Sequence, residues 1–184
     1  MTARQRTTET APWTKGYVQI YTGDGKGKTT AAFGLALRAA GAGLPVFIAQ
    51  FMKGGDYSEV RALGRFEDLI TLRQYGRGRF IRGKPAEEDI RAAKEGLAEV
   101  RSILRSGRYR VVILDEAGIA AFYGLVSVED LLALIDGKPA DVELVITGRR
   151  ADPRLLARAD LVTEMREVKH YYSGGVQARR GIEN

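Results

Sequence analysis

The sequence predicts a single α/β domain with a mainly parallel central sheet flanked by helices. Short apolar runs rich in β-branched and aromatic residues alternate with helical patterns along all 184 residues, and this alternation is typical of parallel sheets. The runs are almost continuously apolar, as in strands buried on both faces. No internal repeat or linker divides the chain, so we expect one domain.

Six runs are predicted to form the strands of this sheet. They cover residues 16–21, 45–51, 69–75, 109–115, 142–148 and 159–168. Of the helices between them, the clearest begins after Pro85, has acidic residues in its first turn and ends at Gly107, in agreement with the helix dipole and with glycine caps. Its apolar residues form one stripe at helical spacing, namely Ile90, Ala93, Leu97, Val100 and Leu104.

Composition limits the cellular context and the classes of site. Hydrophobic residues make up 45% of the chain, enough for a core, but no run is long enough to span a membrane, and the N-terminus has no apolar signal-peptide core. The chain has no cysteine, which excludes disulfides and thiolate metal sites and fits a cytoplasmic protein. We expect residues 1–15 to be a mobile tail, with a transit peptide as the alternative, and residues 16–184 to be the folded domain.

The net charge of +6 is concentrated in one segment. No acidic residue occurs between Asp68 and Glu87, whereas five basic residues do: Arg73, Arg77, Arg79, Arg82 and Lys84. One basic segment indicates one anionic partner rather than a general affinity for nucleic acid or membranes. A solvated loop without a ligand is the alternative.

The stretch TGDGKGKTT has the character of a phosphate-binding loop. The usual pattern is a glycine, four residues and then Gly-Lys-Ser/Thr, but Thr22 stands where the first glycine is expected. The glycines would let backbone N–H groups face a phosphate, Lys28 would add charge, and Thr29 would add a hydroxyl ligand for Mg²⁺. A glycine-rich surface turn is the alternative. The predicted nucleotide-binding residues are Thr22, Gly23, Asp24, Gly25, Lys26, Gly27, Lys28, Thr29 and Thr30.

An acidic pair follows the fourth predicted strand. VVILDE ends in Asp115 and Glu116, and carboxylates at a strand tip hold Mg²⁺ in many nucleotide-binding proteins. The two elements together predict a site for a nucleoside triphosphate with Mg²⁺. Polar residues at other strand ends, including Lys53, Arg149 and the basic segment, are expected at the same edge of the sheet.

Five stretches resemble the phosphate-loop class of ATP:corrinoid adenosyltransferases. In chain order they are TGDGKGKTTAAFG, QFMKG, VVILDE, ITGR and VKHYYSGGVQARRGI, and the resemblance covers nearly everything from residue 16 onward. It implies a RecA-like core, a homodimer, and transfer of the 5′-deoxyadenosyl group of ATP to Co(I) of a corrinoid in adenosylcobalamin biosynthesis. The corrinoid would be cobalamin or cobyrinic acid a,c-diamide, and the loop would hold the departing triphosphate with Mg²⁺ or Mn²⁺. The resemblance also admits a reductase or flavoprotein partner that supplies electrons.

The resemblance also implies roles for individual residues. Lys28 would stabilise the leaving group, Thr29, Asp115 and Glu116 would hold the metal, and Arg149 matches the arginine of the family's TGR element. After the third strand the family has aromatic residues near the lower face of the cobalt, and here YGRGRFIRGK departs from that pattern. We therefore expect Phe80 to take over the aromatic role, with Tyr75 as the alternative. The full set of corrinoid candidates is Lys53, Tyr75, Arg77, Arg79 and Phe80.

The single histidine, His170, is expected to be structural. The cobalamin-ligating motif Asp-x-His-x-x-Gly would need Asp and Gly where Val168 and Ser173 stand.

Two other functions remain open, a small-molecule kinase and a RecA-like ATPase that binds nucleic acid. The kinase would release ADP, and the ATPase would need a longer basic and aromatic surface than one loop.

Overall fold

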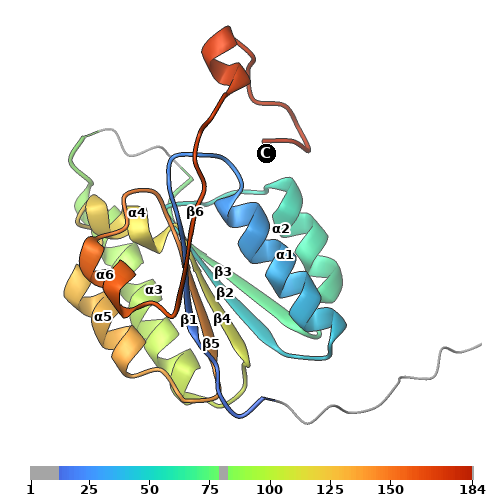
Figure 1. The fold of residues 1–184 in the computed structure, drawn as a ribbon, viewed down its shortest axis with the longest axis vertical. Coiled ribbons are helices and arrows are strands. Elements are labelled where there is room, and N and C mark those ends of the chain that lie inside the picture. Colours follow the sequence, from blue (N-terminus) through green and yellow to red (C-terminus); the bar gives the residue numbers. More distant parts are fainter. Residues whose placement is uncertain (1–12, 79–82, 184) are drawn as a thin grey trace, which may run out of the picture.

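The computed structural model describes residues 13–78 and 83–183, which form a six-stranded sheet covered by helices on both faces (Figure 1). All the pairings are parallel, and the order is β3-β2-β4-β5-β1-β6. The predicted α/β class and all six strands are confirmed, although the sixth strand is only four residues long. The strands are β1 (Val18–Thr22), β2 (Val46–Phe51), β3 (Ile70–Tyr75), β4 (Val111–Asp115), β5 (Glu143–Thr147) and β6 (Leu161–Glu164).

Two helical layers bury the two faces of the sheet. One face is covered by α1 (Lys28–Gly41) and α2 (Ser58–Leu63), which is followed by a 3₁₀ turn (Gly64–Phe66). The other is covered by α3 (Glu87–Arg105), α4 (Ala117–Phe122), α5 (Val128–Asp136) and α6 (Pro153–Arg158) (Figure 1). Helix α3 confirms the predicted apolar stripe, because Ala93, Leu97, Val100 and Leu104 are buried in it. The central strands β2 and β4 are buried throughout, as their continuous apolar runs predict.

The strand order determines which loops meet at the carboxyl edge of the sheet. Strand β5 lies between β1 and β4, so the glycine-rich loop after β1 and the acidic pair after β4 are two strands apart. The loops after β2 and β3 lie on the far side of β4. Because every strand runs in the same direction, all of these loops open on one edge, where open α/β sheets bind their ligands.

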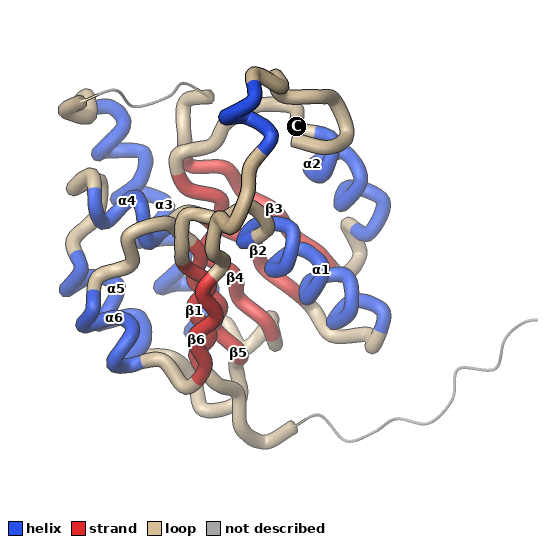
Figure 2. Tube along the Cα trace, turned by 45° about the horizontal axis from the view of Figure 1, so that its top comes forward, coloured by secondary structure: helices blue, strands red, loops and turns tan. Residues whose placement is uncertain are grey.

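Residues 165–183 form an irregular segment after β6, which we call the 165–183 segment. It contains a short 3₁₀ turn (Tyr171–Gly174) and returns toward the loop after β1 (Figures 1 and 2). Most of its side chains are exposed. At the other end of the described chain, the Trp13 indole donates a hydrogen bond to the carbonyl oxygen of Asp141 (3.2 Å). Across the described ranges, no helix is long and apolar enough to cross a membrane.

Candidate active site

The glycine-rich loop connects β1 directly to the first turn of α1. Gly23 and Gly27 have φ angles of 94° and 117°, a region that side chains other than glycine rarely adopt. Gly27 is the N-cap residue of α1, and the helix begins at Lys28, as the sequence predicts. The N-terminus of a 14-residue helix therefore opens into the loop and offers its free N–H groups to an anion.

Lys28 is folded back into this loop. Its Nζ donates hydrogen bonds to the carbonyl oxygens of Gly23 and Gly25, both at 2.7 Å. Burial lowers the pKa of the Lys28 ammonium, and the positive charge of Arg149 lowers it further. This effect of Arg149 on the pKa of Lys28 is consistent with the prediction that Arg149 lies near the loop. A triphosphate in the loop would relieve the repulsion between the two cations, because both would then face negative charge.

Two glycines of the loop also make room for another part of the chain. A Cβ added to Gly23 would lie 2.4 Å from the Met165 carbonyl oxygen, and one added to Gly25 would lie 2.7 Å from the same atom. The Gly25 N–H donates to that oxygen at 2.7 Å. The glycines thus permit the close approach of the 165–183 segment, a reason for their presence that the phosphate-loop pattern does not reveal.

Asp115, at the end of β4, is the centre of the site. Its buried carboxylate accepts four hydrogen bonds. Thr29 and Thr147 donate their hydroxyls to Oδ1 at 2.8 and 2.7 Å. Gln50 and Lys53 donate to Oδ2 at 3.1 and 3.2 Å. One carboxylate therefore joins the start of α1 to the ends of β2 and β5, and it brings together Thr29, Lys53 and Asp115, which the sequence assigns to one edge.

Glu116 follows Asp115 in an uncommon backbone conformation. Its φ is 61°, and its N–H donates to the Thr147 hydroxyl at 3.0 Å. Its carboxylate lies 3.9 Å from Lys53 Nζ. Burial raises the pKa of Glu116, and the charge of Asp115 raises it further, while Lys53 opposes both.

The carboxylates of Asp115 and Glu116 stabilise the charged form of Lys53. Burial lowers the pKa of its ammonium, but the charges of Asp115 and Glu116 outweigh that effect, so the pKa is raised. The ammonium also donates to the Thr29 hydroxyl at 3.2 Å. The Lys53 ammonium therefore lies next to the oxygen atoms of Thr29, Asp115 and Glu116, which are the predicted ligands of the metal ion.

Two polar residues of the site are missing from the sequence prediction, Gln50 and Thr147. Both are fully buried at the ends of apolar strands, and both bind Asp115 directly. Gln74 on β3 extends the network by donating to Gln50 Oε1 at 2.9 Å. A polar residue in an otherwise apolar strand end is a signal that sequence inspection could have used, because a buried polar group needs a partner.

The oxygen atoms of Thr29, Asp115 and Glu116 have the chemistry that Mg²⁺ prefers. Within the described ranges, no group of three or more His, Cys, Asp or Glu is arranged to hold a metal ion. Thr29, Asp115 and Glu116 could hold a Mg²⁺ ion whose other ligands would be phosphate oxygens and water, as is usual for nucleotide-bound Mg²⁺.

The loops after β2 and β3 contact each other beside this cluster. The Gly76 N–H donates to the Lys53 carbonyl oxygen at 3.1 Å, and a Cβ added to Gly54 would lie 2.3 Å from the Gly76 carbonyl oxygen. The start of the basic segment is thereby held next to Lys53. Arg77 follows, exposed and paired with Glu88 at 3.3 Å. Arg79 and Phe80, two predicted corrinoid contacts, lie outside the described residues.

Tyr75 is turned toward α3 rather than toward the phosphate loop. Its ring packs against Phe51, with centroids 5.7 Å apart, and a Cβ added to Gly96 of α3 would lie 2.4 Å from it. Burial raises the pKa of its hydroxyl, and the Glu99 carboxylate adds to this effect. Tyr75 is therefore part of the wall between β3 and α3.

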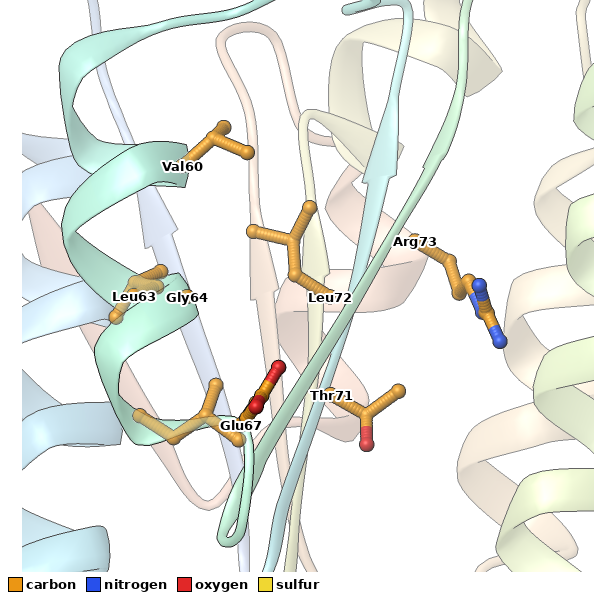
Figure 3. A pocket seen from close by; sticks show the side chains of 8 residues that line it. Val60, Leu63, Gly64, Glu67, Thr71, Leu72 and Arg73 are labelled. Atoms are coloured by element: carbon orange, nitrogen blue, oxygen red, sulfur yellow. The ribbon is translucent and has the colours of Figure 1, made fainter.

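A separate pocket of about 380 Å³ lies between α2 and the edge strand β3. Figure 3 shows Val60 and Leu72 turned toward the space between helix and strand, and Leu63 also lines the pocket. Arg73 points to the opposite side of β3 in the same view. No residue of the phosphate loop or of the Asp115 cluster lines this pocket, so it is not part of the candidate active site.

His170 has a local partner. Its Nδ1 accepts the N–H of Tyr172 at 3.0 Å and so caps the 3₁₀ turn, and its ring lies 4.9 Å from that of Tyr171. These contacts agree with the structural role expected for this histidine.

Comparison with known proteins extends over nearly the whole chain. A family model described as ATP:corrinoid adenosyltransferase BtuR/CobO/CobP matches residues 14–184. The corrinoid adenosyltransferase of Pseudomonas aeruginosa is 34% identical over 170 residues, covering 92% of this chain and 84% of that protein. The corrinoid adenosyltransferase of a Sinorhizobium species is 33% identical over 184 residues, covering 98% and 86%. That of Escherichia coli K12 is 33% identical over 174 residues, covering 92% and 86%.

Proposed function

The chain belongs to the ATP:corrinoid adenosyltransferase family, and we propose that the cluster around Lys28 and Asp115 is the place where it carries out that family's reaction. The protein transfers the adenosyl group of ATP to the cobalt of a corrinoid. In our proposal the group is 5′-deoxyadenosyl, the acceptor is Co(I), and inorganic triphosphate leaves. The product would serve adenosylcobalamin biosynthesis.

The observation that carries the proposal is the closeness of the loop to the Asp115 cluster. Thr29, the first residue after the loop lysine, lies 2.8 Å from the Asp115 carboxylate. Attack of cobalt on C5′ drives negative charge onto the departing triphosphate. In this proposal the Lys28 ammonium and the N–H groups at the start of α1 would stabilise that charge.

A divalent cation, Mg²⁺ or Mn²⁺, would supply further charge stabilisation when bound. Thr29, Asp115 and Glu116 would hold it, and Lys53 would give up its contact with Asp115 to make room. Glu116 is a metal ligand in this proposal and not a base, because Co(I) is itself the nucleophile and no water has to be activated.

The ATP site in this proposal consists of the loop residues Thr22 to Thr30 together with Arg149. Most of the loop contributes backbone N–H groups, Lys28 contributes its ammonium, and Thr29 contributes its hydroxyl. Arg149 is exposed, yet its charge lowers the pKa of both Lys28 and Glu116. It would therefore lie within reach of the triphosphate.

We place the corrinoid over the loops that follow β2 and β3. Lys53 and Arg77 would face its carboxylate or amide groups, and the contact between the two loops supports a common role. Arg77 would exchange its exposed partner Glu88 for the ligand at little cost, because such pairs are worth only about 0–1 kcal/mol. Arg79 and Phe80 remain proposed contacts. Tyr75 would act from the wall behind them. A reductase or flavoprotein would supply the electrons.

Product analysis tests the reaction. The protein is incubated with ATP, Mg²⁺ and a chemically reduced corrinoid, and the visible spectrum is followed for a light-sensitive Co–C product. We expect one triphosphate for each alkylated corrinoid. ADP as the main nucleotide product would indicate the kinase alternative, and pyrophosphate would contradict the proposed leaving group.

Lys28→Ala provides the sharpest test of the site. We expect the turnover number to fall about 100-fold or more, as for the loss of one preorganised group that stabilises charge in the transition state. The matched control is Lys94→Ala, which removes an exposed lysine from α3 and should leave turnover unchanged. Turnover of Lys28→Ala within a few-fold of wild type would mean that the triphosphate does not lie in this loop.

A further inference from the structure

The second lysine of the phosphate loop, Lys26, points away from the phosphate side. Its Nζ donates to the Glu183 carboxylate at 2.7 Å, to the Ile182 carbonyl oxygen at 2.9 Å and to the Tyr171 hydroxyl at 3.2 Å. All three partners belong to the 165–183 segment. Lys28, two residues later, has the opposite orientation and reaches into the loop.

Glu183 is at the centre of the contacts that hold this end of the segment. It accepts hydrogen bonds from the Arg179 N–H at 2.8 Å, from the Arg179 guanidinium at 3.3 Å and from the Tyr171 hydroxyl. Its side chain is only 16% exposed, although the surrounding segment is largely open to solvent. Hydrogen bonds from Arg179, Lys26 and Tyr171 hold the pKa of Glu183 well below its usual range.

The beginning of the segment is fastened to the same loop by backbone contacts. The Met165 N–H donates to the Thr22 carbonyl oxygen at 2.9 Å, and the Met165 carbonyl oxygen accepts the Gly25 N–H at 2.7 Å. Both ends of the segment therefore lie on residues 22–26. Between them, side chains such as Val168 and Tyr172 are 94% and 68% exposed.

We propose that Lys26 and Glu183 are positioning residues for ATP, because their ion pair fastens the 165–183 segment to the phosphate loop and holds the loop in the shape that receives the triphosphate. This inference rests on the proposed function of the loop. The Lys26 side chain is an anchor for the segment and not a ligand of phosphate. By linkage, ATP binding then stabilises the docked segment as much as the docked segment strengthens ATP binding.

Three variants test the anchor, namely Lys26→Met, Glu183→Gln and the double variant. ATP–Mg²⁺ affinity is measured by calorimetry, and amide hydrogen exchange is followed in residues 171–183. We expect each single change to weaken ATP binding about five-fold, a magnitude set by the modest strength of one partly exposed ion pair. The double variant should be no weaker than either single variant, because both remove the same link. ATP should slow exchange in the segment of the wild type and not in the variants.

Steady-state kinetics distinguish positioning from a general structural role. The KM for ATP should rise about five-fold in both single variants while kcat stays within about two-fold, because the link acts on binding and not on the transferred group. Lys26→Arg keeps the charge and should retain most of the wild-type affinity. Glu129→Gln is the matched control, since it breaks an exposed ion pair with Arg154 (2.7 Å) on the opposite helical layer and should change neither ATP binding nor exchange in the segment.

Two results would overturn the inference. If Lys26→Met weakens ATP binding while Glu183→Gln leaves it unchanged or tightens it, Lys26 is a phosphate ligand. If both variants speed exchange in the segment but leave the KM for ATP unchanged, the link is structural only. Lys28→Met reports separately on the proposed function: if it binds ATP as tightly as the wild type, the loop is not the triphosphate site, whatever the other variants do.

Discussion

Thr147 is one buried side chain that contacts two candidate metal ligands, Asp115 and Glu116. Its hydroxyl donates to the Asp115 carboxylate at 2.7 Å and accepts the Glu116 N–H at 3.0 Å. That second bond stabilises the left-handed backbone at Glu116, a conformation that costs about 1–3 kcal/mol in residues other than glycine. The threonine therefore contacts the carboxylate of Asp115 and the backbone of Glu116 with a single hydroxyl.

Thr147→Val should lower the free energy of unfolding by about 1–3 kcal/mol, because it leaves the partly buried Glu116 N–H without this partner and removes one donor to the buried Asp115 carboxylate. Urea denaturation measures the change. Thr163→Val in the exposed strand β6 is the control and should stay within about 0.5 kcal/mol of wild type. Equal stability of the two variants would mean that the Thr147 hydroxyl has no such role.

Glu116 predicts a pH dependence of stability. Burial and the charge of Asp115 raise the pKa of Glu116 above its ordinary value of 4.5, so the folded state holds this proton more tightly than the unfolded state does. In that case the free energy of unfolding decreases as the pH rises from 4.5 through the folded-state pKa. Glu116→Gln removes this loss.

In metal-free buffer, the Glu116→Gln variant should therefore gain stability relative to wild type as the pH is raised from 4.5 to neutrality. Urea denaturation at both ends of this range measures the difference. A stability difference that is the same at both pH values would show that the Glu116 pKa is not raised by folding. Glu95→Gln, which removes an exposed carboxylate from α3, provides the reference.

The loops after β2 and β3 are held next to each other by close backbone contacts. Gly54, Gly76 and Gly78 approach one another so closely that a Cβ on any of them would lie within 2.4 Å of a backbone atom of the facing loop. This contact holds Lys53 next to the beginning of the basic segment. Glycine is required here by the space available and not only by backbone conformation.

Gly76→Ala tests this arrangement. Its Cβ would lie 2.4 Å from the Lys53 backbone nitrogen, so the loops must separate, and we expect a loss of about 1–3 kcal/mol in unfolding free energy. Corrinoid affinity should fall more than ATP affinity. The control is Gly34→Ala in α1, where nothing lies within 4 Å of an added Cβ and where alanine should stabilise the helix by about 0.5–1 kcal/mol. A larger loss for ATP than for corrinoid would contradict the assignment of these loops.

Exposed apolar side chains on β6 and in the 165–183 segment are relevant to the oligomeric state of the protein. Strand β6 is an edge strand whose four residues are all exposed, Leu161 and Val162 among them. Further large apolar residues are exposed in the 165–183 segment: Val168, Tyr172, Val176 and Ile182. Exposed apolar side chains of this size are a feature of interfaces between protein chains. Together with the homodimer that the family resemblance implies, this favours a second copy of the chain as the partner.

Light scattering coupled to size exclusion should therefore give twice the 20.2 kDa mass of one chain. Val162→Lys, which places a charge on the exposed edge strand, should shift the protein toward the monomer, because charged residues prevent pairing at sheet edges. Arg158→Glu on α6 is the control for a change of surface charge. A wild-type monomer at high protein concentration would contradict the predicted dimer.

The sequence by itself determined the elements and their chemistry. Continuous apolar runs predict strands such as β2 and β4, the stripe of α3 predicts its buried face, and TGDGKGKTT with VVILDE places Lys28, Thr29 and Asp115 at strand ends. These signals are local, because hydrophobic periodicity and turn chemistry act over a few residues. One general rule, that parallel strands open their loops on a single edge, was sufficient to bring these residues together.

Only the tertiary structure decided which side chains meet and in which direction they point. Thr147 reaches Asp115 from a strand 32 positions away, Lys26 meets Glu183 across 157 positions, and the order of the strands makes both contacts possible. Tyr75 turns toward α3 and Lys26 turns away from the phosphate side, although their neighbours in the chain suggest otherwise. Such contacts depend on how distant elements pack, and local patterns carry no information about that packing.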